Sequence, residues 1–193
     1  MKMNKNNSLF LVIGMIIIAA FTRLIPHQPN FTALGAIALF GSAFLKSRHM
    51  AILVTFAALF ISDLFLNNLI YHSYSEGFTL FMQGSMWVYL AIGLVVLAGR
   101  VMLKKSTPIR FLGGVVSATL IFFIITNIGH WVGPFGLHPR NFTGLIATFI
   151  DALPFVLNTL AGNLFFGAVL FGIHEWVTNK QATLDTQFEV DKY

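Results

Sequence analysis

The sequence predicts an all-α integral membrane bundle of about six transmembrane helices, forming a single transmembrane domain over residues 1–193. Of the 193 residues, 56% are hydrophobic and only 10% are charged, whereas soluble domains have about 25% charged residues. The mean hydropathy is +0.78. Apolar runs of about 20 residues, long enough to cross a hydrocarbon core of roughly 30 Å, recur along most of the chain. They leave no room for a separate soluble domain.

The apolar runs and the residues that interrupt them predict where the chain crosses the membrane. The first run lacks a signal-peptide cleavage site, so we expect it to be a retained helix. The second is short and rich in Gly and Ala, which predicts a tilted helix or one only partly exposed to lipid. Pro154 is expected to divide the last run into a short re-entrant or interfacial helix and a final crossing. The expected spans are residues 8–25, 32–45, 50–67, 79–100, 110–130 and 145–177.

The distribution of basic residues predicts the orientation. With both termini in the cytoplasm, ten of the 12 Lys and Arg residues fall on the cytoplasmic side, and only Arg23 and Arg140 lie outside. The net charge of +5 is then explained by anionic lipid headgroups. We therefore expect the lipid bilayer, and no nucleic acid, as a partner.

The predicted external loops contain two related turns, HQPNFT at residues 27–32 and HPRNFT at residues 138–143. An Asn or Thr that precedes an apolar run can accept hydrogen bonds from the free amides of the first helical turn. The two turns therefore have two open explanations. They either start two helices, or they contribute His27, Asn30, His138 and Asn141 to a binding site on the external face.

Two acids lie within or beside apolar segments, Asp63 in FISDLF and Asp151 in TFIDALPF. An ionised carboxylate is unfavourable in lipid, so such residues usually face the bundle interior, a partner or water. Three interpretations of Asp63 stay open: a structural pair with Arg140 or Arg23, coordination of a ligand or ion, and proton coupling.

The remaining polar residues give weaker signals. His27 and His138 either contact a ligand or form hydrogen bonds within their turns. The absence of His-x-x-x-His and His-Glu-x-x-His spacing predicts no protein-only metal site. Asn127, Asn158 and Asn163 are expected to form interhelical hydrogen bonds. No catalytic motif and no phosphate-binding Gly-rich loop occurs, so we predict no catalytic residues and no cofactor.

The segments RLIPHQPNFTALGAIALFGSAF, FISDLF and LHPRNFTGL resemble a family of small bacterial membrane proteins with a Pro-His-x-Pro-Asn-Phe-Thr signature. These proteins are similar to the substrate-binding S components of energy-coupling factor (ECF) vitamin transporters, and the nearest analogy is the BtuM-like, cobalamin-binding group. The resemblance implies a multi-pass protein of the bacterial inner membrane. It also implies a vitamin-like ligand and, as partner, an ECF-type ATPase with its transmembrane module.

Transferred onto this chain, the BtuM-like pattern implies a binding-site histidine at His27, an acid at Asp63 and an arginine at Arg140. Two features depart from the pattern. The chain has no cysteine, so the family's cobalt-coordinating residue has no counterpart. The Ala-x-x-x-Ala sequence by which many S components dock their partner is also missing from the first helix.

The leading hypothesis is a protein, not an enzyme, that captures a vitamin-like small molecule, such as cobalamin or a related corrinoid, on the external face. Two other classes stay open: a membrane enzyme acting on a lipid headgroup, and a structural or assembly subunit of a membrane complex. The predicted substrate-binding residues are His27, Asn30, Asp63, His138, Arg140 and Asn141.

Overall fold

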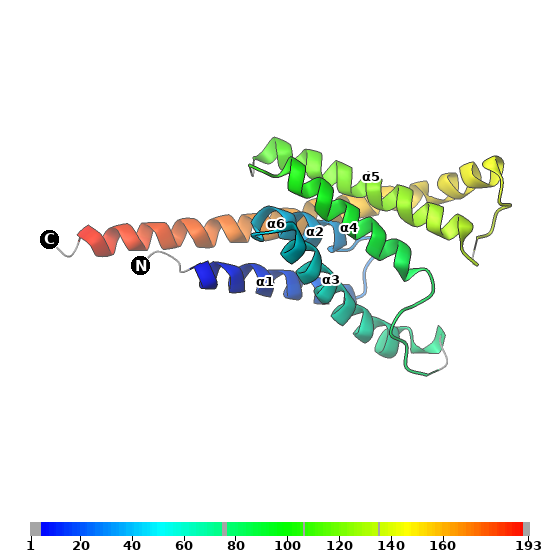
Figure 1. Cartoon of the computed structure of the whole chain (residues 1–193), viewed down its shortest axis with the longest axis horizontal. Helices are drawn as coiled ribbons and strands as arrows, with labels where there is room; N and C mark the ends of the chain where they lie inside the picture. Colours follow the sequence, from blue (N-terminus) through cyan, green and yellow to red (C-terminus); the bar gives the residue numbers. More distant parts are fainter. Residues whose placement is uncertain (1–4, 75–76, 106, 135, 191–193) are drawn as a thin grey trace.

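The computed structural model of the chain describes residues 5–74, 77–105, 107–134 and 136–190. Within these residues the chain forms six α-helices and no strand, which confirms the all-α bundle (Figure 1). A 3₁₀ turn, η1 (Thr22–Leu24), follows the first helix, and a π-helical turn, η2 (Leu66–Ile70), and a 3₁₀ turn, η3 (His72–Tyr74), follow the third. The helices are α1 (Lys5–Phe21), α2 (Leu34–Phe44), α3 (Arg48–Phe65), α4 (Ser85–Met102), α5 (Pro108–Val132) and α6 (Phe142–Val190).

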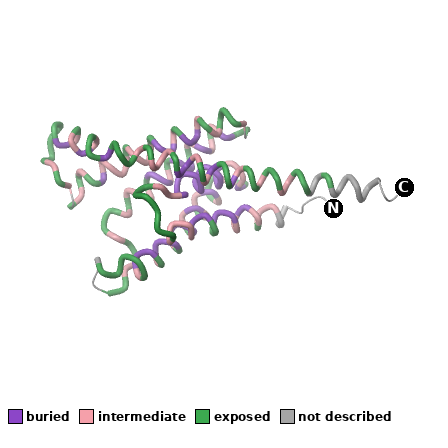
Figure 2. Tube along the Cα trace, turned by 180° about the vertical axis from the view of Figure 1, so that it is seen from behind, coloured by how far each residue is buried: buried purple, intermediate pink, exposed green. Residues whose placement is uncertain are grey.

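The short helix α2 forms the centre of the bundle. It packs against each of the other five α-helices, and its residues from Leu34 to Ser42 are all buried. The buried positions gather around it where the helices cross (Figure 2). Small residues allow this close packing: a β-carbon on Gly35 would overlap the side chain of Asn163, and one on Gly41 would lie 3.0 Å from Oγ1 of Thr55. The Gly- and Ala-rich composition therefore indicates burial within protein, so α2 is covered by helices and not by lipid.

Four helical segments are long and apolar enough to cross a membrane. They are Arg48–Ile70, Ser85–Met102, Pro108–Val132 and Phe142–Lys180. The helices α1 and α2, with 17 and 11 residues, rise only about 25 and 16 Å at 1.5 Å per residue. Neither covers a hydrocarbon core of roughly 30 Å by itself. Six helices are present as predicted, but length supports full crossings for four of them.

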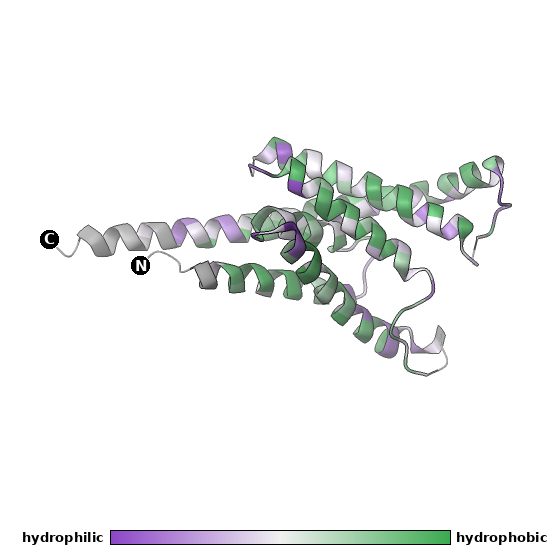
Figure 3. Ribbon diagram, in the orientation of Figure 1, coloured by the Kyte–Doolittle hydropathy of each residue, from purple (hydrophilic) through white to green (hydrophobic). Residues whose placement is uncertain are grey.

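The helix α6 runs unbroken through Pro154, so the predicted division at this residue is wrong. A proline inside a helix removes one backbone hydrogen bond, and a transmembrane helix tolerates this where neighbouring helices support it. Here α6 packs against both α5 and α2. Beyond the other helices it continues as a single rod that becomes hydrophilic after the bundle (Figure 3).

Of the three asparagines that were predicted to form interhelical hydrogen bonds, Asn163 does so. Asn163 of α6 donates from Nδ2 to Oγ1 of Thr119 on α5 at 3.1 Å, and both residues are buried. Asn158 donates from Nδ2 to the carbonyl oxygen of Pro29 at 3.0 Å, so it holds the turn before α2. Asn127 instead donates to the carbonyl oxygen of Phe123 on its own helix. The interhelical prediction is wrong for that residue.

The bundle opens into two arms at the end opposite the chain termini (Figure 1). One arm consists of α5 and the first part of α6, and the other of the second half of α3 with η2. Among the described residues α3 makes no contact with α5 or α6, while α4 contacts both α3 and α5. The space between the arms is therefore lined by α3, α4 and α5.

We expect Arg100→Ala to lower the free energy of unfolding by about 3 kcal/mol, because hydrogen bonds from a charged donor contribute about 1.5–3 kcal/mol each. The guanidinium of Arg100 donates to the carbonyl oxygens of Ser42, Leu45 and Lys46 at 2.7, 2.6 and 2.6 Å. It thereby satisfies carbonyls at the end of α2 that the helix itself leaves free. Denaturant unfolding in detergent measures the loss. Lysine has a compact ammonium in place of the planar guanidinium, so the stability of Arg100→Lys should lie between those of Arg100→Ala and the wild type. Equal stability of all three proteins would contradict this role of Arg100.

Candidate functional site

An ion pair between α3 and the segment after α1 forms the centre of the candidate site. Nη1 of Arg23, in η1, lies 2.6 Å from Oδ1 of Asp63 and donates to Oγ of Ser62 at 2.7 Å. The side chains of Arg23 and Asp63 are only 13% and 12% exposed. Of the two partners that the sequence suggested for Asp63, the structure selects Arg23 and not Arg140.

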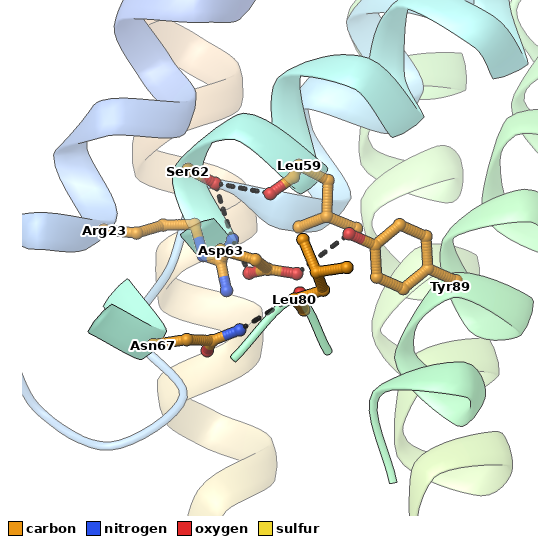
Figure 4. A network of polar contacts seen from close by, with 7 residues as sticks. All are labelled: Arg23, Leu59, Ser62, Asp63, Asn67, Leu80 and Tyr89. Atoms are coloured by element: carbon orange, nitrogen blue, oxygen red, sulfur yellow. Dashed lines mark hydrogen bonds and ion pairs between the residues drawn. The ribbon is translucent and has the colours of Figure 1, made fainter. Parts of the chain in front are cut away.

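A tyrosine from a third element completes this pair. The hydroxyl of Tyr89, on α4, donates to Oδ2 of Asp63 at 3.0 Å. The hydroxyl of Ser62 donates to the carbonyl oxygen of Leu59 at 2.9 Å and is thereby oriented to accept from Arg23. The close-up shows these side chains converging from η1, α3 and α4 (Figure 4). Both carboxylate oxygens of Asp63 therefore have a partner.

The π-helical turn η2 positions the wall beside the ion pair. Asn67 is buried, and its Nδ2 lies 3.4 Å from the carbonyl oxygen of Leu80. Asn68 bonds reciprocally with Thr79, whose amide donates to Oδ1 of Asn68 at 2.8 Å. These bonds hold the segment before α4 against η2. Gly84, the residue immediately before α4, has a positive φ of 87°, so α4 begins at Ser85 and not at the predicted residue 79.

A cavity of about 440 Å³ lies beside the ion pair, between α3, α4 and α5; we call it the Arg23 cavity. Its polar wall includes the two charged side chains, Asn67 and Gln83. Its apolar wall is formed by the N-terminal turn of α4 and the C-terminal turn of α5, and it includes Trp87. Gly129 of α5 makes room for the indole, because a β-carbon at Gly129 would overlap the ring.

The Arg23 cavity lies near one end of the apolar helices that form it, because its wall includes the first residues of the span Ser85–Met102 and the last residues of the span Pro108–Val132. Asp63 is fifteen residues into the apolar span Arg48–Ile70, which corresponds to about 23 Å from its start. An ion pair at such a position is desolvated unless water enters from the cavity. The guanidinium of Arg23 and the carboxylate of Asp63 lie side by side. The site can therefore bind a solute that carries both a hydrogen-bond donor and a hydrogen-bond acceptor.

A second cavity, of about 300 Å³, lies between the end of α5 and the first part of α6; we call it the His138 cavity. Nε2 of His138 lies 2.7 Å from Oδ2 of Asp151. Asp151 is the other acid that the sequence singled out, and it pairs with a histidine from the loop before its own helix. His130 lines both cavities.

The first of the two related turns does not cap a helix. The structure records no side-chain cap at the start of α2, whose N-cap residue is Ala33. Asn30 instead adopts a left-handed conformation with φ of 63°, which Asn tolerates better than most residues. Nδ1 of His27 lies 2.9 Å from the carbonyl oxygen of Gln28, and both His27 and Asn30 are exposed. The turn packs on α6 at Gly162, where a β-carbon would lie 2.9 Å from the backbone of Thr32.

The second turn does start a helix. Oδ1 of Asn141 accepts from the amide of Gly144 at 2.9 Å, so the capping prediction is confirmed here. Nε1 of Trp131 donates to the carbonyl oxygen of Pro139 at 3.0 Å and holds the turn on α5. Arg140 is exposed and makes no hydrogen bond or ion pair within the described residues.

The structure does not bring the six predicted site residues together. The first turn contacts α6 at Asn158, sixteen residues after the helix begins, or about 24 Å along its axis from the second turn. Of the six, only Asp63 lines the Arg23 cavity and only His138 lines the His138 cavity. The two turns therefore lie at different levels along α6, because α6 extends well past the first turn.

Sequence reasoning misses two of the groups around Asp63. It suggests Arg23 only as a structural partner, and it does not single out Tyr89 or Asn67. Tyr89 is 26 residues from Asp63, so no local spacing connects them. An acid in an apolar run needs a partner, so the sequence contains a signal for the ion pair. It contains no comparable signal for Tyr89 or Asn67.

The family that matches the chain is described as a family of unknown function (DUF6580), and the match covers residues 3–185. Because this is nearly the whole chain, the protein belongs to that family. No curated protein and no solved structure matches the chain.

Proposed function

We propose that this DUF6580 protein is a membrane solute-binding protein that captures a small, vitamin-like molecule in the Arg23 cavity. The observation that carries the proposal is the Arg23–Asp63 pair, whose carboxylate lies within an apolar span, beside a cavity near one end of the apolar helices. A buried ion pair adds little net stability compared with apolar residues of the same volume. Ionisable residues inside a membrane are therefore candidates for function, in contact with a substrate or an ion.

The cavity supports a particular size and chemistry of solute. Ligand cavities have volumes of about 300–1,000 Å³, and the Arg23 cavity has about 440 Å³. A guanidinium and a carboxylate on one wall, with Trp87 on another, favour a flat, polar compound with both donors and acceptors. A corrinoid is much larger than this cavity and would lie mostly outside it. Among vitamin-like compounds we therefore propose a smaller one.

Uptake is the proposed role of this binding. The positive-inside distribution supports placement in the bacterial inner membrane with both termini cytoplasmic, so the cavity would open to the external side. Because the sequence contains no nucleotide-binding motif, uptake driven by ATP would need a partner. The resemblance to ECF S components supports an ECF-type ATPase and transmembrane module in that role.

The enzyme alternative receives less support from the site. A general acid or base must exchange a proton with its substrate, whereas both oxygens of Asp63 are already engaged by Arg23 and Tyr89. If the protein were an assembly subunit, the Arg23 cavity would have no small-molecule ligand. Thermal unfolding in the presence of candidate solutes distinguishes this role from solute capture.

Thermal unfolding of the purified protein against a panel of water-soluble vitamins, cobalamin and cobinamide included, tests the proposal. A ligand that binds only the native state stabilises it by about 2.7 kcal/mol at a concentration of 100 Kd. We expect one small compound to raise the Tm saturably. We also expect a weaker shift for Gln83→Ala, which removes an exposed polar group from the wall.

A charge swap separates ligand binding from folding. Arg23→Asp combined with Asp63→Arg keeps an ion pair but reverses its direction, so the fold should persist while the Tm shift disappears. Glu175→Gln, an exposed position on α6 away from both cavities, serves as the control with an unchanged shift. The absence of any shift in folded protein, or a full shift in the swapped variant, would reject solute capture at this cavity.

A further inference from the structure

The His138 cavity has walls that offer mainly hydrogen-bond acceptors. Thr148 donates its hydroxyl hydrogen to the carbonyl oxygen of Gly144 at 2.9 Å. Asn127 donates one amide hydrogen to the carbonyl oxygen of Phe123 at 2.7 Å. Since a backbone carbonyl can only accept, both donors are identified without ambiguity. The oxygen atoms Oγ1 of Thr148 and Oδ1 of Asn127 keep lone pairs, and Asn127 also keeps one amide hydrogen.

The pair of His138 and Asp151 adds further free hydrogen-bond acceptors to this cavity. Nε2 of His138 lies 2.7 Å from a carboxylate oxygen of Asp151, so this nitrogen carries the hydrogen. The other nitrogen of a neutral His138 ring is then an acceptor. The second oxygen of Asp151, whose side chain is 64% exposed, also remains available. With both histidines neutral, the cavity carries one negative charge and more free acceptors than free donors.

The complementary ligand is a cation rich in N–H groups. A primary ammonium offers three donors and one positive charge, whereas a quaternary ammonium offers charge without a donor. The cavity volume of about 300 Å³ suits a small group, and Phe155 supplies an aromatic ring in the wall. A metal ion fits less well, because no three His, Asp or Glu side chains in the described part of the chain gather closely enough to hold one.

We propose that the His138 cavity binds a primary ammonium group. Two sources have this chemistry, a free amine and the headgroup of an aminophospholipid. The cavity lies where α5 ends and α6 begins, at the end of the bundle away from the termini (Figure 1). The two cavities share one wall residue, His130, but Asn127, His138, Thr148 and Asp151 line only the His138 cavity, so the proposal does not depend on solute capture in the Arg23 cavity.

Isothermal titration of the detergent-purified protein with ethanolamine, and with choline as the matched ligand without N–H donors, tests the proposal. We expect saturable binding of ethanolamine that is at least tenfold tighter than that of choline. Asp151→Asn should weaken it at least tenfold, and Asp151→Glu should restore part of the affinity. Glu175→Gln removes an exposed carboxylate from the same helix and should leave binding unchanged.

The lipid source is tested in nanodiscs of phosphatidylethanolamine or phosphatidylcholine. A higher Tm in phosphatidylethanolamine that Asp151→Asn abolishes, without binding of free ethanolamine, would assign the site to the lipid headgroup. Thr148→Val removes an acceptor without removing the charge, so it provides a second test should Asp151→Asn fail to fold. Equal binding of choline and ethanolamine, or no binding and no lipid preference, would overturn the assignment.

Discussion

Replacing Asp63 with alanine is expected to lower the free energy of unfolding by about 3–5 kcal/mol, the range for removing one partner of a buried ion pair. The Arg23 guanidinium would then stay desolvated, with Ser62 as its one remaining hydrogen-bond partner among the described residues. Tyr89 would also lose the acceptor for its hydroxyl. Equilibrium unfolding in detergent or lipid nanodiscs measures this loss.

The double replacement of Arg23 and Asp63 by leucine provides the control. Replacing a buried pair with apolar residues is often neutral or stabilising, by about 1–4 kcal/mol. The double variant should therefore be much more stable than Asp63→Ala, and it should bind no solute in the Arg23 cavity. If the single and double variants were equally destabilised, the pair would hold the fold through packing and not through charge.

Gly144→Ala is expected to destabilise the protein by more than about 2 kcal/mol, at the upper part of the range for overpacking. A β-carbon at Gly144 would overlap the carbonyl oxygen of Pro139, and a backbone atom cannot move aside as a flexible side chain can. The turn must then move away from α6. His138 would separate from Asp151, so the variant should also lose the binding of primary amines.

The same helix offers a matched control in Gly172, where a β-carbon would have no described atom within 4 Å apart from its chain neighbours and the nearby backbone of α6. Alanine at an open helical position should be neutral or stabilise by up to about 1 kcal/mol, because Ala has the higher helix propensity. Thermal unfolding of the two variants compares them directly. Equal effects at Gly144 and Gly172 would contradict the close contact with Pro139.

The all-α architecture is confirmed because helix formation follows from a local property of the chain. A segment in lipid must satisfy its own backbone hydrogen bonds, so a long apolar run becomes a helix whatever lies beside it. A local signal also marked one helix start, since Asn141 caps α6 as predicted. Ser47, which was not singled out from the sequence, caps α3 by accepting from the amide of Met50. The same signal was misleading at Asn30, where a turn with positive φ replaces a cap.

The candidate site could be predicted only in part, since it depends on which helices become neighbours. Asp63 is recognisable because a carboxylate in an apolar run requires a partner. Its partners Arg23 and Tyr89 lie 40 residues before and 26 residues after it, and helix order decides that they meet. Asp151 is likewise recognisable as unusual, but its contact with His138 depends on the path of the loop between α5 and α6.

The sequence by itself determined the membrane class, the all-α architecture and the acids that need partners, because hydropathy and the energetics of charge in lipid act on each segment separately. Only the tertiary structure decided which helices surround α2, that α6 continues through Pro154, and that the two related turns lie at different levels. These features arise from packing between segments that are distant in the chain. No property of a single segment contains that information.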